Sequence, residues 1–135
     1  NKQVVPRLIM DGPSPVFKSL GLQSKNLKTV LKGLEQVTKK GGTAAGSAIN
    51  IDGKKMGGKT GTSQVRSISK KERESGVLTN EQLKWHMRNH GLFVGYAPTD
   101  NPRYAVCVIT EHAGGSGPAA KTTAKVISEL LKYGI

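Results

Sequence analysis

One ten-residue stretch, residues 56–65 (MGGKTGTSQV), concentrates side chains that could bind an anion. Lys59 supplies a compact positive charge, and Thr60 and Thr62 supply hydroxyl donors. If the stretch is extended, residues two apart share a face, so the two threonine hydroxyls would point the same way. Gly61 between them would let another molecule's backbone approach closely. The pattern therefore predicts a site for a carboxylate or a phosphate.

The same residues also fit a pattern for nucleotide phosphates. Residues 53–60 (GKKMGGKT) match the loop G-x-x-x-x-G-K-T, which needs a strand before it and a helix after it. Asp52 and Gly53 instead predict a turn before the loop. Residues 61–68 alternate loosely and begin with poor helix formers, so they are interpreted as a strand. A P-loop nucleotide binder is kept as the less favoured alternative.

Composition suggests a further alternative. The chain has 21 Lys and Arg against 9 Asp and Glu, a net charge of +12, which would suit a basic nucleic-acid or polyanion-binding module. The few aromatic residues do not alternate with the basic ones, so no stacking platform is indicated and no nucleic acid partner is expected. The chain opens at Asn1 with neither a signal peptide nor a membrane-spanning run, as expected of a mature or excised piece.

Helical elements are predicted in three places. Apolar residues recur at helical spacing over residues 27–37 and again after Pro118, where a closing helix is expected. A capping-box pattern predicts a short helix over residues 80–88. His86 and His90 could share one face of that helix, but no third ligand is apparent, so no metal site is expected.

Two runs rich in strand formers, residues 92–97 and 104–111, are separated by a hairpin loop. The second run is apolar on both faces, so it is predicted to be a central strand covered on both sides. Cys107 lies in this run and is expected in the core. The predicted fold class is α+β, an antiparallel sheet flanked by helices.

Lys-Thr-Gly is one of the motifs of a class of serine enzymes that form acyl-enzymes, together with S-x-x-K. Further segments of the chain match the same class. Three of them are Gly42-Thr43-Ala44, residues 90–98 (HGLFVGYAP) and residues 101–108 (NPRYAVCV). Together with residues 56–65 they closely resemble the end of a class B penicillin-binding protein. Residues 111–120 (EHAGGSGPAA) resemble the elongation, or rod-shape, branch, with His-Ala where that branch often has Asn-Gly.

The resemblance implies a fold and a function. Residues 1–135 would be the C-terminal part of a transpeptidase (penicillin-binding) domain, with a fold like that of penicillin-binding proteins and serine β-lactamases. The parent would be a peptidoglycan D,D-transpeptidase that cross-links stem peptides through a serine acyl-enzyme, binds β-lactams and needs no cofactor. It would serve cell-wall synthesis and cell shape, anchored in the bacterial cytoplasmic membrane with this domain on the periplasmic face.

The resemblance also implies roles for matched residues. Lys59 would belong to the proton and charge network around the serine. Thr60 and Thr62 would bind the terminal carboxylate of a stem peptide or a β-lactam, and the Thr62 N–H would form half of the oxyanion hole. Gly61 must stay small so that substrate backbone can add along the strand. Lys59 and Thr62 are thus the expected catalytic residues, and Thr60, Gly61 and Thr62 the expected substrate-binding residues.

Two other motif matches are interpreted as chance. Residues 67–70 (SISK) fit S-x-x-K but follow Lys-Thr-Gly in a charged segment, and residues 24–26 (SKN) fit S-x-N at the start of the first helix. In the resembled family both motifs precede Lys-Thr-Gly. We therefore expect the chain to lack the nucleophile and to be inactive alone. Because the rest of the domain would complete the sheet, we also expect an exposed apolar edge or face and possible self-association.

Overall fold

The structure, a computed structural model, describes residues 1–9, 12–13 and 15–134. It divides into two compact units, Asn1–Gly33 and Leu34–Ile135, which we treat separately. Helix α1 (Ser24–Gln36) begins in the first unit and ends in the second, and it confirms the helix predicted over 27–37. None of the helices in the described part of the chain has both the length and the apolar character needed to cross a bilayer.

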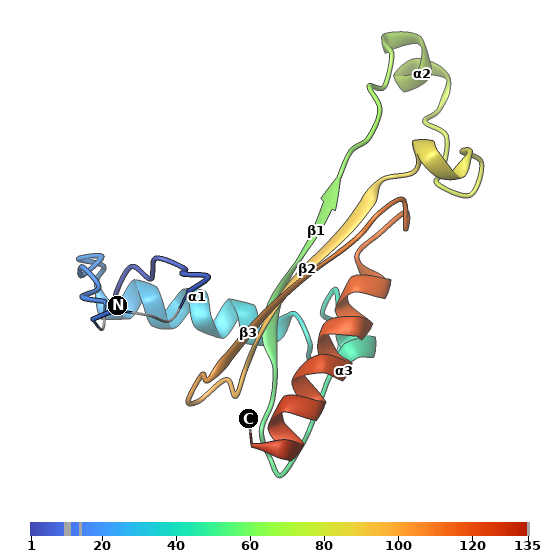
Figure 1. The fold of residues 1–135 in the computed structure, drawn as a ribbon. Coiled ribbons are helices and arrows are strands. Elements are labelled where there is room, and N and C mark those ends of the chain that lie inside the picture. Colours follow the sequence, from blue (N-terminus) through green and yellow to red (C-terminus); the bar gives the residue numbers. More distant parts are fainter. Residues whose placement is uncertain (10–11, 14, 135) are drawn as a thin grey trace. The chain divides into compact units, whose positions relative to one another are not determined.

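The second unit is built on a three-stranded antiparallel sheet with the strand order β1-β2-β3 (Figure 1). The strands are β1 (Gly57–Ser63), β2 (His90–Ala97) and β3 (Tyr104–Thr110). Helix α3 (Gly117–Tyr133) packs along β2 and β3, as expected for the closing helix with a proline in its first turn. The predicted α+β class is confirmed.

The core lies between the sheet and α3. Phe93 and Ala97 on β2 are fully buried, and so is Ile127 on α3. Small residues let the helix approach the sheet closely: Ala120 is 1% exposed, and a methyl group added at Gly95 would crowd α3. This packing fixes β2, and β2 in turn fixes β1 through the ladder.

The opposite face of the sheet is open and apolar, as predicted. Val94 on β2 is 48% exposed and Ile109 on β3 is 59% exposed. Two expectations are therefore wrong: residues 104–111 are not a central strand covered on both sides, and Cys107 is exposed rather than in the core. The reason is that β3 is the last strand of this sheet and packs on α3 through one face only.

The helix predicted over residues 80–88 is also wrong. The side chain of Gln82 does accept a hydrogen bond from the Thr79 N–H at 2.8 Å, as a capping box requires. The Asn80 side chain, however, donates to the Gly114 carbonyl at 2.8 Å and accepts from the Asn89 N–H at 3.2 Å. These long-range bonds fold the segment into a loop, and local helix propensity does not overcome them.

Outside α1 and α3, the described residues form only short helical turns. They are η1 (Ala45–Ser47), α2 (Lys70–Ser75) and η2 (Trp85–Met87). Because His86 lies in η2 and His90 begins β2, these two histidines do not share a helix face. No cluster of three or more His, Cys, Asp or Glu side chains suited to a metal occurs within the described ranges.

Candidate functional site

The stretch singled out from the sequence forms β1, a strand at the margin of the sheet. Its backbone pairs with β2 in antiparallel register, with Lys59 opposite Val94 and Thr60 opposite Phe93. No strand pairs with its other edge within the residues that the structure describes. The predicted extended conformation is confirmed over residues 57–63, but the strand predicted over residues 61–68 ends at Ser63. The P-loop alternative is wrong, because the chain after Thr60 continues as strand where a nucleotide loop would start a helix.

The register sorts the predicted site residues onto two faces. Directly opposed residues of an antiparallel pair share a face, so Thr60 and Thr62 lie on the same face of the sheet as Phe93. Helix α3 packs on this face where it is formed by β2 and β3. Lys59 lies on the Val94 face, which is open. The two threonine hydroxyls therefore share a face, as predicted, and the lysine belongs to the other one.

Lys59 nevertheless stays close to the threonines. Its side chain is exposed, and its Nζ donates a hydrogen bond to the Thr60 carbonyl oxygen at 2.7 Å. That bond folds the long side chain back over its own strand. The positive charge is thus held beside the backbone of β1 at Thr60, where it would favour an anion.

Thr60 has a partner that the sequence did not assign a role. The Thr43 Oγ1 lies 3.1 Å from the Thr60 Oγ1, within hydrogen-bond distance. The sequence signal for this contact is the Gly42-Thr43-Ala44 motif, which by itself indicates the family resemblance and not a contact with Thr60. A side chain at Gly42 would overlap the backbone carbonyl of Gln36, so this position needs glycine.

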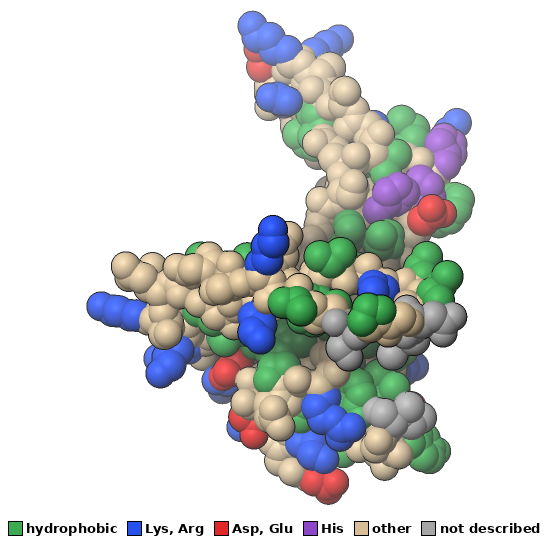
Figure 2. Space-filling model, turned by 60° about the vertical axis from the view of Figure 1, so that its left-hand side comes forward, with side chains coloured by type: hydrophobic (Ala, Val, Ile, Leu, Met, Phe, Trp, Pro, Cys, Tyr) green, Lys and Arg blue, Asp and Glu red, His purple; other side chains and the backbone are tan. Residues whose placement is uncertain are grey.

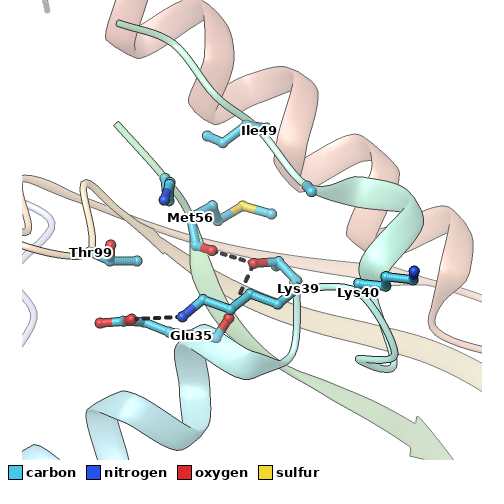
Figure 3. A pocket seen from close by; sticks show the side chains of 9 residues that line it. Glu35, Lys39, Lys40, Ile49, Met56 and Thr99 are labelled. Carbon is cyan, nitrogen blue, oxygen red and sulfur yellow. Dashed lines mark hydrogen bonds and ion pairs between the residues drawn. The ribbon is translucent and has the colours of Figure 1, made fainter. Parts of the chain in front are cut away.

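The start of β1 is fixed by a second threonine. The Thr38 hydroxyl donates to the Met56 carbonyl oxygen at 2.6 Å, a bond drawn as a dashed line at Met56 in Figure 3. Both residues are buried, and Met56 is only 1% exposed. This bond connects the chain just after α1 to the residue that precedes β1. It is another contribution that periodicity and propensity do not reveal.

A cavity of about 330 Å³ lies next to this bond and away from the predicted site residues. Figure 3 shows the ion pair at its rim, where Lys39 Nζ is 3.5 Å from a Glu35 carboxylate oxygen. The predicted site on β1 is instead an open strand edge. The cavity is lined by Glu35, Thr38, Lys39, Lys40, Ala48, Ile49, Lys55, Met56 and Thr99.

Gly61 is half-buried within β1. A methyl group there would lie 3.3 Å from the Leu92 side chain, a tight but not impossible contact. A side chain at this position would therefore press on Leu92 of the neighbouring strand β2. That Gly61 must stay small for a substrate backbone to add along the strand remains a prediction.

Two histidines and a tryptophan meet where β2 and β3 pass into their connecting loops. The His90 and His112 ring centroids are 4.6 Å apart, and Trp85 lies 4.6 Å from His112. The His112 N–H donates to His90 Nδ1 at 2.9 Å, and Figure 2 shows histidine side chains gathered together. His112 has a φ of +52°, a left-handed conformation that Asn or Gly adopts more readily. The cluster supports the loop that follows β3.

The S-x-x-K match at residues 67–70 lies in exposed chain before a short helix. Ser67 is exposed, and Ser69 caps α2 by accepting from the Glu72 N–H at 3.2 Å. No residue of α2 is buried, so no packed helix organises a nucleophile here. Arg66 forms a two-pronged ion pair with Glu72, and these hydrogen bonds lower the pKa of that carboxyl group to about 2. Residues 67–70 thus have a structural setting, and it differs from that of a catalytic serine.

The chain matches the family model described as penicillin binding protein transpeptidase domain over residues 2–131. Relatives named peptidoglycan D,D-transpeptidase MrdA include that of Acinetobacter baumannii, 39% identical over 90 residues (66% of this chain, 13% of the relative). The Haemophilus influenzae protein is 40% identical over 78 residues (57% and 11%). The Escherichia coli K12 protein is 35% identical over 80 residues (59% and 12%). The chain thus spans only 11–13% of the length of these relatives.

Solved structures agree. The penicillin-binding protein PBP2 in complex with MreC from Helicobacter pylori gives a TM-score of 0.76 over 98% of this chain and 22% of that one, at 24% identity, which shows the fold. Pseudomonas aeruginosa PBP2 in complex with WCK 5153 gives 0.60 over 93% and 23%, at 29% identity. These matches confirm the predicted resemblance and give no support to a basic nucleic-acid or polyanion-binding module.

Proposed function

Because this chain belongs to the penicillin-binding protein transpeptidase family, we propose that it is the C-terminal part of an elongation-type peptidoglycan D,D-transpeptidase. The observation that carries the proposal is β1, a Lys-Thr-Gly-Thr strand with a free edge at the margin of an antiparallel sheet. The nucleophilic serine, its lysine partner and the middle motif would come from the remainder of the protein. Alone, residues 1–135 would be inactive.

Substrate binding would use the free edge of β1. An extended stem peptide can add to such an edge as a further strand, and Gly61 leaves room for its backbone. The hydroxyls of Thr60 and Thr62 share a face and would donate to the terminal carboxylate, with Lys59 supplying positive charge nearby. A β-lactam would present its own carboxylate to the same groups.

The chemistry would be acyl transfer in two steps. The serine oxygen of the remaining domain would attack the carbonyl carbon of the D-Ala-D-Ala bond, and D-alanine would leave with a proton on its nitrogen. An acceptor amine would then attack the acyl-enzyme, forming the cross-link and returning a proton to the serine. The Thr62 N–H would stabilise the negative oxygen in both tetrahedral intermediates, and Lys59 would take part in proton and charge movement.

The open sheet face indicates where the rest of the domain would pack. Val94 and Ile109 leave apolar surface there, and Lys59 shares that face. Covering this face would bring the lysine next to the missing catalytic segment. In the isolated chain the same surface would favour self-association. The parent would act on the periplasmic face of the bacterial cytoplasmic membrane, with no metal or organic cofactor.

The complete parent protein provides the test, with acylation by a fluorescent penicillin as the measurement. Losing one hydrogen bond to a charged group costs about 1.5–3 kcal/mol, so Thr60→Val or Thr62→Val should slow acylation about 10- to 150-fold. Thr122→Val, an exposed change on α3, is the matched control and should acylate like the unmodified protein. A complete parent that takes up no label would refute the proposed function.

A further inference from the structure

We infer that Thr43 is a positioning residue that orients the Thr60 hydroxyl toward the substrate carboxylate. The inference rests on the proposed function. Its basis is the 3.1 Å separation between the Thr43 and Thr60 Oγ1 atoms, which come from segments 17 positions apart in the sequence. The contact joins two side chains and is not one of the backbone hydrogen bonds that pair the strands, so it depends on these two threonines.

The direction of this hydrogen bond decides what Thr60 can offer a ligand. A hydroxyl has one proton to donate and two lone pairs to accept with. If Thr60 donates to Thr43, its only proton is occupied. If Thr43 donates to Thr60, the Thr60 proton is free to point at an incoming anion. A carboxylate can only accept, so its arrival selects the second arrangement, and the two bonds in series polarise one another.

The backbone around Thr43 is held on both sides. At Gly42 a side chain would overlap the carbonyl groups of Gln36 and Val37, so glycine lets the chain pass close to the end of α1. At Ala44 the N–H donates to the Val37 carbonyl oxygen at 2.9 Å, and the residue is only 6% exposed. The outer two residues of the motif thus fix the backbone, and the hydroxyl of the threonine between them contacts β1.

The chain between α1 and η1 makes two hydrogen bonds to β1 and the residue before it, and the two differ in role. The Thr38 hydroxyl holds the Met56 carbonyl inside the core, before the strand begins. Thr43 is exposed, and its hydroxyl contacts a side chain, not the backbone of the strand. Removing the Thr43 hydroxyl should therefore leave the fold intact and change only how Thr60 meets its ligand.

The experiment measures the second-order acylation rate of the complete parent protein with a fluorescent penicillin. Thr43→Val keeps the shape and removes the hydroxyl, and we expect acylation to slow about 5- to 10-fold. Thr43→Ser keeps the hydroxyl and should recover to within about twofold of the unmodified rate. Thermal unfolding of both variants should match that of Thr122→Val, the exposed control on α3.

Two further measurements distinguish a lost orientation of the Thr60 hydroxyl from a general disturbance of the fold by Thr43→Val. In a Thr60→Val background, Thr43→Val should add little, because its target hydroxyl is already absent. With a β-lactam whose carboxylate is esterified, the Thr43→Val penalty should shrink, because the ester accepts a weaker hydrogen bond than a carboxylate.

Outcomes that would overturn the inference are clear. They are a Thr43→Val protein that acylates normally, an equal penalty with or without the Thr60 hydroxyl, or a loss of thermal stability that Thr43→Ser does not restore. In each case the unmodified parent would still take up label, so the proposed function would stand. If the unmodified parent takes up no label, the proposed function and this inference fall together.

Discussion

The buried hydrogen bond between Thr38 and Met56 offers the sharpest test of how β1 is held. Thr38→Val replaces the hydroxyl with a methyl group of similar size and removes the donor that lies 2.6 Å from the Met56 carbonyl oxygen. Both residues are buried, so water cannot easily take the place of the lost donor. We expect the variant to loosen the start of β1, which begins one residue later at Gly57.

The expected magnitude follows from burial. A carbonyl that loses its hydrogen-bond donor in a buried setting costs about 1–3 kcal/mol, and no large cavity adds to this because the side-chain volume is nearly kept. Thr38→Ser makes the opposite change, because it keeps the hydroxyl and loses one methyl group. Its cost should be about 0.8 kcal/mol or somewhat more. The valine variant should therefore be the less stable of the two.

Native-state hydrogen exchange on the complete parent protein measures the stability of β1 and of α3 separately. Amide protection along β1 should fall about 5- to 150-fold in Thr38→Val, while protection in the centre of α3 should change less. Thr122→Val serves as the exposed control. Protection of β1 equal to that of the unmodified protein, or lower in Thr38→Ser than in Thr38→Val, would refute the argument that this hydroxyl anchors the strand.

Three further outcomes are expected. Phe93→Ala should destabilise the folded parent by about 3–5 kcal/mol, seen as a lower thermal midpoint, because the ring is fully buried between sheet and α3. Gly91→Ala should prevent correct assembly of β2, because its added carbon would overlap the Gly115 carbonyl; normal folding and acylation would contradict this. The Arg66–Glu72 pair should protect residues 64–80 from proteolysis above about pH 4.5, the ordinary pKa of the carboxyl group. Because pairing lowers the folded-state pKa of Glu72 to about 2, that protection should be lost as pH falls toward 2, and Glu72→Gln should abolish this pH dependence.

The sequence determined a good deal about β1 and the helices. Three glycines and the poor helix formers after Thr60 indicated an extended strand, and the structure has one at Gly57–Ser63. Apolar residues at helical spacing located α1 and α3. These features depend on residues within a turn or two of one another, so propensity and periodicity are sufficient to predict them. The order of the motifs along the chain was also sufficient to indicate the family, because comparing motif order requires no knowledge of distances in space.

Where long-range contacts compete with local preference, the sequence misled. The capping box at Thr79 forms, yet Asn80 is bound to Gly114 and Asn89, and the predicted helix is replaced by a loop. Cys107 lies in an apolar run and is still exposed, because its strand ends the sheet and packs on one side only. Burial depends on which elements are present and adjacent, and composition does not encode that directly.

The candidate site divides along the same line. Residue types and spacing were enough to nominate Lys59, Thr60 and Thr62 as one anion-binding group. Only the folded chain shows that the face carrying Lys59 is the open one, and that Thr43 reaches Thr60 across 17 positions. A strand's period of two fixes which residues share a face, but the partner that meets a side chain from another segment is set by the path of the backbone between them.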